Sequence, residues 1–276
     1  MVAADQPSDP ARVRVERRGP GGAVAWVILQ RPEVHNALDA RTVAELSAIF
    51  GEFLGESPTA LRGVVLAAEG ASFCAGADIG WMRASLDLDE LANLREADLL
   101  ASMYASIDRC PVPLIARVQG SAFGGGVGLL AVADLVIAEA STRFGLTETR
   151  LGILPAVVAP VVVRRIGDGQ ARALLPLGRR FDAPTALRVG LVHEIATGLD
   201  GLDTAVDGAV RDLLAAAPGA ARATKALIRD IRHLSTDEAR GEMARRSAAA
   251  RISDEGQEGL RAFLDRRSPY WVEEIT

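Results

Sequence analysis

The chain is organised around the stretch Gln119-Gly120-Ser121-Ala122-Phe123-Gly124-Gly125-Gly126-Val127-Gly128. The apolar run before it, 113–118, is typical of a buried strand, and the run after it, 129–133, of a buried helix. A strand, a glycine turn and a helix N-terminus leave backbone N–H groups unpaired at one point, where the helix dipole adds positive potential. This arrangement suits an anion or a developing oxyanion. Tight helix–strand packing explains the adjacent glycines equally well, and the stretch alone does not decide between the two.

Composition and charge argue against several classes of function. The chain of 276 residues has a net charge of -5 and no basic run, which disfavours nucleic-acid binding. The glycine spacing is not G-x-G-x-x-G, and no Gly-Lys-Ser/Thr follows, so a dinucleotide site and a P-loop are weak interpretations. No apolar run reaches the roughly 18 residues of a membrane span, and residues 1–10 lack a signal-peptide pattern. We expect a cytoplasmic protein without a membrane or nucleic-acid partner.

Cysteines and histidines are too sparse to predict a cross-link or a metal site. Cys74 and Cys110 are the only cysteines, so no disulfide framework is expected and a reducing cytoplasm is favoured. The histidines, His35, His193 and His233, are scattered along the chain. We expect no metal site, and a structural role for His193.

Apolar runs that alternate with amphipathic segments predict an α/β fold. A hairpin over 13–29 comes first, followed by a helix over 40–54 for which Asp39 is a plausible N-cap. Further strands are expected at 63–67, 113–118, 134–138 and 191–195, and further helices at 91–107, 157–166, 169–175, 183–189, 202–216, 220–233 and 236–264. We expect a disordered N-terminus at 1–10, an α/β core at 11–198, and a helical region at 199–276 that packs on a neighbouring subunit.

A second small-residue turn follows the strand predicted at 63–67. Residues 71–79 include Gly76 and lead to Asp78, a candidate helix start. Free backbone N–H groups would then lie at the carboxyl end of a strand, where open α/β sheets bind ligands. Taken alone, the segment is better explained as an ordinary turn.

Glu148 is the candidate proton-transfer residue. It lies between Leu146 and Leu151, and an apolar setting raises the pKa of a carboxyl group, which suits it to general acid–base work. The usual alternative for a single glutamate is a surface ion pair, here with Arg143 or Arg150.

Together these segments resemble the crotonase superfamily, the enoyl-CoA hydratases and isomerases, from about Val13 to the C-terminus. The shared motifs occur in the family's order: Arg31-Pro32 through Asn36-Ala37-Leu38, Cys74-Ala75-Gly76-Ala77-Asp78, Gly124-Gly125-Gly126, Phe144-Gly145 with Glu148 and Gly152, and Glu258-Gly259 with Phe263. The resemblance implies a spiral of ββα units with a C-terminal helical trimerisation region. It also implies a homotrimer or a hexamer built as a dimer of trimers.

The resemblance further implies roles for individual residues. The backbone N–H groups of Ala77 and Gly125 match an oxyanion hole that holds the thioester oxygen of an acyl-CoA while an enolate forms. Glu148 matches one of two family glutamates, the one that exchanges a proton with the acyl chain. The positions that match the family's coenzyme A channel are Val34, Ala37, Ala75, Asp78 and Ile79. No metal or resident cofactor is implied, because coenzyme A arrives as part of the substrate.

One departure from the family pattern bears on the reaction. The second hydratase glutamate lies three residues after the oxyanion glycine, where this chain has Gly128. Two carboxylates perform hydration most simply, whereas one carboxylate suffices to move the single proton of a double-bond shift. The alternatives to a hydratase are therefore a Δ3,Δ2-enoyl-CoA isomerase that uses Glu148 alone and a catalytically weak acyl-CoA binder.

The residues of three motifs favour hydration over a double-bond shift. Residues 123–128 read Phe-Gly-Gly-Gly-Val-Gly, 77–83 read Ala-Asp-aliphatic-x-Trp-Met-Arg, and 144–148 read Phe-Gly-Leu-Thr-Glu. They look most like bacterial hydratases of the leucine-degradation branch, which act on methylglutaconyl-CoA. The carboxylate of that acyl chain would need a cation, for which Arg83 and Arg150 are candidates, although a solvated surface arginine is the commoner explanation for each.

Overall fold

A six-stranded sheet forms the larger part of the core. The computed structural model, which describes residues 10–273, arranges its strands in the order β1-β2-β3-β4-β6-β9. β1 runs antiparallel to β2, and the other neighbours are parallel. The strand bounds are β1 Val13–Arg18, β2 Val24–Leu29, β3 Gly63–Ala68, β4 Leu114–Val118, β6 Leu135–Glu139 and β9 Glu194–Ala196. The disorder predicted for residues 1–10 lies outside the described residues, apart from Pro10.

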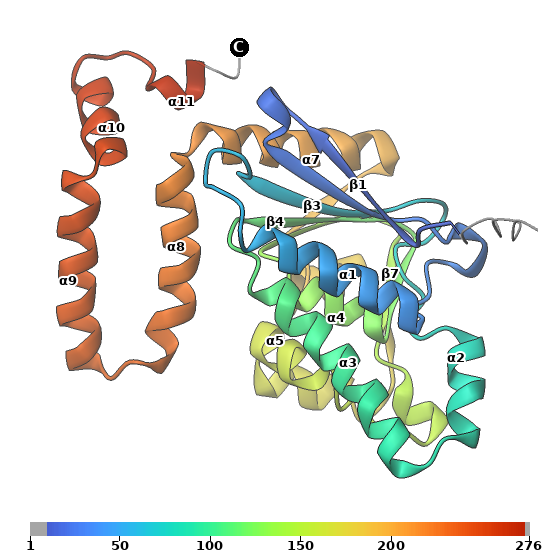
Figure 1. The fold of residues 1–276 in the computed structure, drawn as a ribbon. Helices are drawn as coiled ribbons and strands as arrows, with labels where there is room; N and C mark the ends of the chain where they lie inside the picture. The colour runs from blue at the N-terminus through green and yellow to red at the C-terminus, as the bar shows by residue number, and fades with distance from the viewer. Residues whose placement is uncertain (1–9, 274–276) are drawn as a thin grey trace, which may run out of the picture.

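Both faces of the large sheet are covered by helices. Val64 and Leu66 of β3 belong to an apolar cluster with α1 (Ala40–Phe53) and α3 (Glu90–Asp108). Val65, between them, belongs to a second cluster with α7 (Gly198–Ala215) on the opposite face. Figure 1 shows α1 and α3 on one side of the sheet and α7 on the other. Strands buried on both faces are continuous apolar runs rather than alternating ones, which is why they can be located in the sequence.

A second row of short strands, the inner row, accompanies the large sheet. β5 (Ser121–Phe123), β7 (Arg143–Gly145) and β8 (Arg180–Asp182) form a three-stranded sheet. Single parallel bridges extend this row backwards along the chain, from β5 to Cys74 and from Ala77 to Leu38. Each turn of the chain thus adds one strand to the large sheet and one short stretch to the inner row, which produces a spiral of ββα units.

The buried helix α4 (Gly125–Val132) lies at the centre of the spiral. It contacts α3 and α5 (Ala159–Leu174), and every residue after its first is buried, so its sequence has no polar face. The other α-helices are α2 Ile79–Ala84, α4 Gly125–Val132, α5 Ala159–Leu174, α6 Ala183–Arg188, α7 Gly198–Ala215, α8 Pro218–Asp230, α9 Thr236–Ile252, α10 Asp254–Leu264 and α11 Tyr270–Glu273. Short 3-10 helices are η1 Pro20–Gly22, η2 Pro32–Val34, η3 Ser85–Asp87, η4 Glu148–Leu151 and η5 Ile231–His233.

The C-terminal helices leave the core and return to it. In Figure 1, α8, α9 and α10 form an arm beside the core, and α11 comes back to contact α7. The carboxylate of Glu255 on α10 accepts hydrogen bonds from the N–H groups of Gly219 and Ala220, both at 2.8 Å, and so caps the start of α8. Within residues 10–273, no helix is both long and apolar enough to cross a membrane.

Differences from the expected elements fall on short or broken segments. β5, β7 and β8 have three residues each, too few for a hydrophobic period, and the sequence does not predict them. The two helices predicted around 157–175 form one helix, α5, with a kink at Gly167, where φ is 78°. The helix predicted over 236–264 is divided at Ser253, which caps α10. The strand predicted at 191–195 begins only at Glu194, because the N–H groups of Leu191 and Val192 donate to the carbonyl of Ala186 rather than to a neighbouring strand.

Candidate active site

Two glycine-containing turns lie side by side at the inner row. The N–H of Cys74 donates to the carbonyl of Ser121 at 3.0 Å, and the N–H of Phe123 donates to the carbonyl of Cys74 at 2.9 Å. Gly76 has φ 97°, and a β-carbon placed on it would lie 3.1 Å from the carbonyl oxygen of Phe123. Only glycine meets both demands, the positive φ and the close approach of the second backbone.

The amide of Ala77 is left free by the pairing of its neighbours. The N–H of Leu38 donates to the carbonyl of Gly76 at 2.7 Å, and the N–H of Asp78 donates to the carbonyl of Leu38 at 2.9 Å. Because this parallel bridge uses the groups on either side of Ala77, the N–H of Ala77 points away from Leu38. It has no acceptor among the described residues.

The amide of Gly125 is free because it starts a helix. Gly125 is the first residue of α4, and the first N–H groups of a helix have no intrahelical acceptor. The preceding N–H, that of Gly124, donates to the carbonyl of Gly145 at 2.9 Å, whereas that of Gly125 has no acceptor in the described range. Ala77 and Gly125 border the same cavity of about 260 Å³, so both donors are available to a group bound there.

The cavity is apolar apart from these amides and a few side chains. Its apolar lining consists of Leu38, Trp81, Met82, Leu100, Phe123, Leu151, Ile153, Leu154, Pro155, Val157 and Val158. Glu148 is the only carboxylate that lines it in the described part of the chain, and no lysine, arginine or histidine of that part does. The cavity therefore combines an apolar wall, two free backbone donors and one ionisable group.

Glu148 is held against the second turn. A β-carbon placed on Gly124 would lie 3.2 Å from Oε1 of Glu148, and Oε2 is buried without a hydrogen-bond partner in the described structure. Burial raises the pKa of this carboxyl group above its usual value. The alternative interpretation of Glu148, a surface ion pair with Arg143 or Arg150, is wrong. Over residues 10–273 Glu148 forms no ion pair, and the guanidinium of Arg143 donates instead to the carbonyls of Ser141 and Thr142.

The predicted coenzyme A contacts lie on two adjoining segments. Ala75 lines the cavity, and its N–H donates to the carbonyl of His35 at 2.9 Å, which joins the segment of Val34 and Ala37 to the turn that carries Ala77. Asp78 and the exposed Ile79 continue that turn into α2. Of the five predicted residues, only Ala75 lines the cavity itself, and the other four belong to the two segments that adjoin it.

Arg31 ties these two segments together, a role that the sequence motif alone does not reveal. Its guanidinium lies 3.0 Å from the carboxylate of Asp78 and 3.1 Å from that of Asp39, and it donates to the carbonyl of Ala37 at 2.8 Å. Asp78 in turn accepts from the N–H groups that begin α2. The turn that carries the free amide of Ala77 is therefore fixed on both sides.

At Gly128, the position of the missing second glutamate, Tyr104 leaves no room for a side chain. A β-carbon placed on Gly128 would lie 2.7 Å from Cζ and 2.8 Å from the hydroxyl oxygen of Tyr104. Tyr104 is 2% exposed, so its ring cannot move aside without disturbing the core. The sequence does not single out Tyr104, because an aromatic residue on the buried face of a helix is ordinarily core packing.

The candidate partners of a substrate carboxylate do not line the cavity. Arg83 and Arg150 are both exposed and absent from its lining. Two side chains that can donate line the cavity instead: Trp81, whose buried Nε1 has no acceptor among the described residues, and Thr147 with its hydroxyl.

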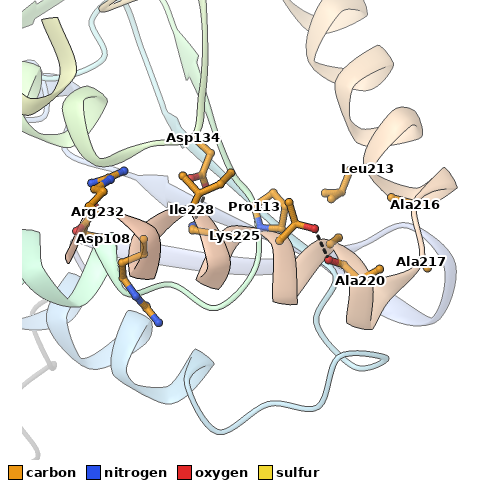
Figure 2. A pocket seen from close by; sticks show the side chains of 13 residues that line it. Asp108, Pro113, Asp134, Leu213, Ala216, Ala217, Ala220, Lys225, Ile228 and Arg232 are labelled. Atoms are coloured by element: carbon orange, nitrogen blue, oxygen red, sulfur yellow. Dashed lines mark hydrogen bonds and ion pairs between the residues drawn. The ribbon is translucent and has the colours of Figure 1, made fainter. Parts of the chain in front are cut away.

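A larger cavity lies between α8 and the core (Figure 2). Both carboxylates that line it are paired, Asp134 with Lys225 at 2.5 Å and Asp108 with Arg164 at 2.5 Å. Both carboxylates of this cavity are thus held in ion pairs, whereas Glu148 in the smaller cavity has no ion-pair partner among the described residues.

Comparison with known proteins gives consistent results over almost the whole length. Residues 20–274 match the family model described as enoyl-CoA hydratase/isomerase. A putative enoyl-CoA hydratase of Thermus thermophilus is 32% identical over 257 residues, which cover 93% of this chain and 99% of that protein.

Solved structures give the same result. An enoyl-CoA hydratase from Shewanella pealeana is 35% identical, with a TM-score of 0.87 over 94% of this chain and 96% of that one. AtuE from Pseudomonas aeruginosa is 36% identical, with a TM-score of 0.89 over 95% of this chain and 99% of that one.

Proposed function

The chain belongs to the enoyl-CoA hydratase/isomerase family and has its crotonase-like α/β spiral, and on this basis we propose that it adds water to an α,β-unsaturated acyl-CoA. The observation that carries the proposal is the joint lining of one cavity by the free amides of Ala77 and Gly125 and by Glu148. Two donors and one acid–base group are what an enolate route requires.

In the proposed reaction, the thioester oxygen accepts hydrogen bonds from the amides of Ala77 and Gly125. These donors stabilise the negative charge that develops as the water oxygen bonds to the β-carbon and the enolate forms. Glu148 gives a proton to the α-carbon and receives one from the added water, so the side chain returns to its starting state. The raised pKa of Glu148 suits this exchange, because it brings the protonated form closer to neutral pH.

A double-bond shift is the second candidate. The observation that favours it is the absence of another carboxylate from the described lining, together with the lack of room for one at Gly128. Moving a proton from one carbon to another needs only Glu148 and the same two amides. A catalytically weak acyl-CoA binder is the third candidate, because the free amides alone would bind a thioester oxygen.

The acyl group is proposed to be branched, with methylglutaconyl-CoA as the leading candidate. The apolar wall, which includes Leu100 and Val158, suits a branched carbon chain. In the described lining, the side chains of Trp81 and Thr147 can donate hydrogen bonds to the terminal carboxylate, and there is no cation. The pantetheine and nucleotide are proposed to follow the two segments that Arg31 joins, toward Val34 and Ile79.

Turnover assays decide among the three candidates. We expect hydration of both crotonyl-CoA and 3-methylglutaconyl-CoA, measured by the loss of the conjugated thioester absorbance, with a higher kcat/KM for the branched substrate. Conversion of a 3-enoyl-CoA to the 2-enoyl isomer without hydration would assign the isomerase instead. Binding of acyl-CoA in calorimetry without either reaction would assign the weak binder and overturn the proposed activity.

We also propose that the arm of α8, α9 and α10 assembles the chain into a homotrimer or a hexamer of two trimers. The proposal is supported by large apolar side chains that the arm leaves exposed in the single chain. They are Ile252 at 79%, Leu260 at 49%, Phe263 at 80% and Leu264 at 76%. Burying such side chains is favourable by about 25 cal/mol per Å², which makes a subunit contact the natural use of this surface.

Sedimentation velocity tests the assembly. We expect a species of three or six times the 29.1 kDa chain mass. Phe263→Asp should shift the distribution toward the monomer, whereas a substitution at an exposed polar position of the same arm, Arg240→Asp, should leave it unchanged. A wild-type chain that stays monomeric at micromolar concentration would contradict the proposal.

A further inference from the structure

The hydroxyl of Tyr104 contacts the first turn of α4. Tyr104 lies on the buried face of α3, and its hydroxyl donates a hydrogen bond to the carbonyl of Gly125 at 2.8 Å. This is the same residue whose N–H is one of the two free donors in the cavity. Tyr104 is not part of the cavity lining, so any effect on a bound acyl group passes through Gly125.

The tyrosine ring and the glycines of α4 are fitted to one another. A β-carbon on Gly125 would lie 3.1 Å from the hydroxyl oxygen of Tyr104, and one on Gly128 would lie 2.7 Å from its ring. The ring therefore occupies the space that side chains at 125 and 128 would otherwise take. Because glycine has the freest backbone of all residues, a turn of this composition needs an external contact to hold its N–H groups in one direction.

Tyr104 stays protonated and acts as a donor. Burial raises the pKa of Tyr104 well above its usual value, and the nearby Cys74 and Glu148 raise it further. A phenol in this state does not act as a base at neutral pH. It keeps its proton for the hydrogen bond to the carbonyl of Gly125.

We propose that Tyr104 is a positioning residue that orients the amide of Gly125 toward the thioester oxygen of the bound acyl-CoA. The inference rests on the proposed function, in which that amide stabilises the enolate. The hydrogen bond fixes the carbonyl end of residue 125, the ring blocks rotation of the first helical turn, and the N–H on the other end of the same residue is thereby held in place. Oxyanion stabilisation depends on such preorganisation, and small misplacements of a donor reduce it strongly.

Tyr104→Phe tests the proposal, because it keeps the ring and removes the hydroxyl. We expect kcat to fall roughly tenfold, with KM changed less than twofold, since the donor matters most in the transition state. α-Proton exchange in heavy water should fall by the same factor as hydration. In infrared spectra of bound butyryl-CoA labelled with ¹³C at the thioester carbonyl, the shift of the carbonyl stretch to low frequency should be smaller than in the wild type.

Tyr270→Phe is the matched control, because Tyr270 is the only other tyrosine of the sequence and lies in α11. It should leave the kinetics and the carbonyl stretch unchanged. A Tyr104→Phe variant with wild-type kcat and carbonyl stretch, even if less heat-stable, would reduce Tyr104 to core packing and overturn the proposal. Loss of hydration with an unchanged rate of α-proton exchange would also overturn the proposal, because Tyr104 would then act on the attacking water and not on the amide of Gly125. If the wild type itself shows no carbonyl shift with butyryl-CoA, the proposed function fails first, and the two failures are thereby separated.

Discussion

Replacing Glu148 by glutamine is expected to lower turnover by roughly 10² to 10⁴, the usual contribution of a general acid–base group. The amide keeps the shape of the side chain, but it cannot exchange a proton. Because Glu148 is the only carboxylate in the described lining, no neighbour is available to replace it. Acyl-CoA binding, measured by calorimetry, should change little, since the two free amides remain. Deuterium incorporation at the α-carbon in heavy water should stop.

The same substitution should change stability in a pH-dependent way. Burial raises the pKa of Glu148 in the folded protein, whereas the unfolded chain has an ordinary glutamate. Between those two pKa values the folded state holds a proton that the unfolded state has lost, so the wild type loses stability as the pH rises through this window. Glutamine does not titrate. The two proteins should therefore melt alike below the window, and the variant should melt higher above it.

Two results would contradict the role of Glu148. Turnover and exchange at wild-type rates in the glutamine variant would mean that another residue moves the proton. A variant that melts lower than the wild type at every pH would mean that the carboxylate is stabilised by a partner rather than strained by burial. Thr147→Ala, at a neighbouring position of the same lining, is a control for nonspecific disturbance of the cavity.

The large sheet could be predicted from the sequence because its central strands are buried on both faces. Apolar runs such as 113–118 and 134–138 coincide with β4 and β6 almost residue for residue. β5, β7 and β8 could not be predicted, because three residues carry no period and because their pairing depends on chain segments far apart in the sequence. The inner row is nevertheless what brings the two turns of the site together.

The site could be predicted in part. The glycine-rich turns mark where free amides can occur, and both Ala77 and Gly125 border one cavity with Glu148. That the amide of Ala77 is free depends on Leu38, which pairs with the residues on either side of it, and no local pattern reveals such a partner. The isolation of Glu148 from Arg143 likewise depends on where the arginine side chain goes in the folded chain.

The lack of room at Gly128 is a third property that the sequence does not reveal. From the sequence alone, Gly128 in place of the second glutamate indicates only the loss of a functional group. In the structure, Gly128 packs against Tyr104, because the ring of this tyrosine on another helix fills the space that a side chain at 128 would need. Restoring a carboxylate by Gly128→Glu therefore tests packing as well as chemistry, and the glutamate would need a smaller residue at 104 to be accommodated.

Replacing Gly125 by proline is expected to lower turnover by roughly 10² to 10³ relative to a Gly125→Ala control, on the scale of losing one oxyanion-hole donor. Proline has no N–H, and the first position of a helix is where a proline is tolerated best, so α4 should still form. A β-carbon at 125 would lie 2.9 Å from Cδ1 of Leu38 and 3.1 Å from the hydroxyl of Tyr104, so any substitution disturbs the packing.

The alanine control separates these two effects. Gly125→Ala adds the same β-carbon but keeps the amide, so its loss of turnover measures the packing disturbance alone. Circular dichroism should show that both variants fold, and KM should differ between them less than kcat, because the lost hydrogen bond strengthens as the enolate forms. If the proline and alanine variants turn over equally, the N–H of Gly125 does not contact the thioester oxygen. The oxyanion would then have to be held by Ala77 and a donor other than the first amide of α4.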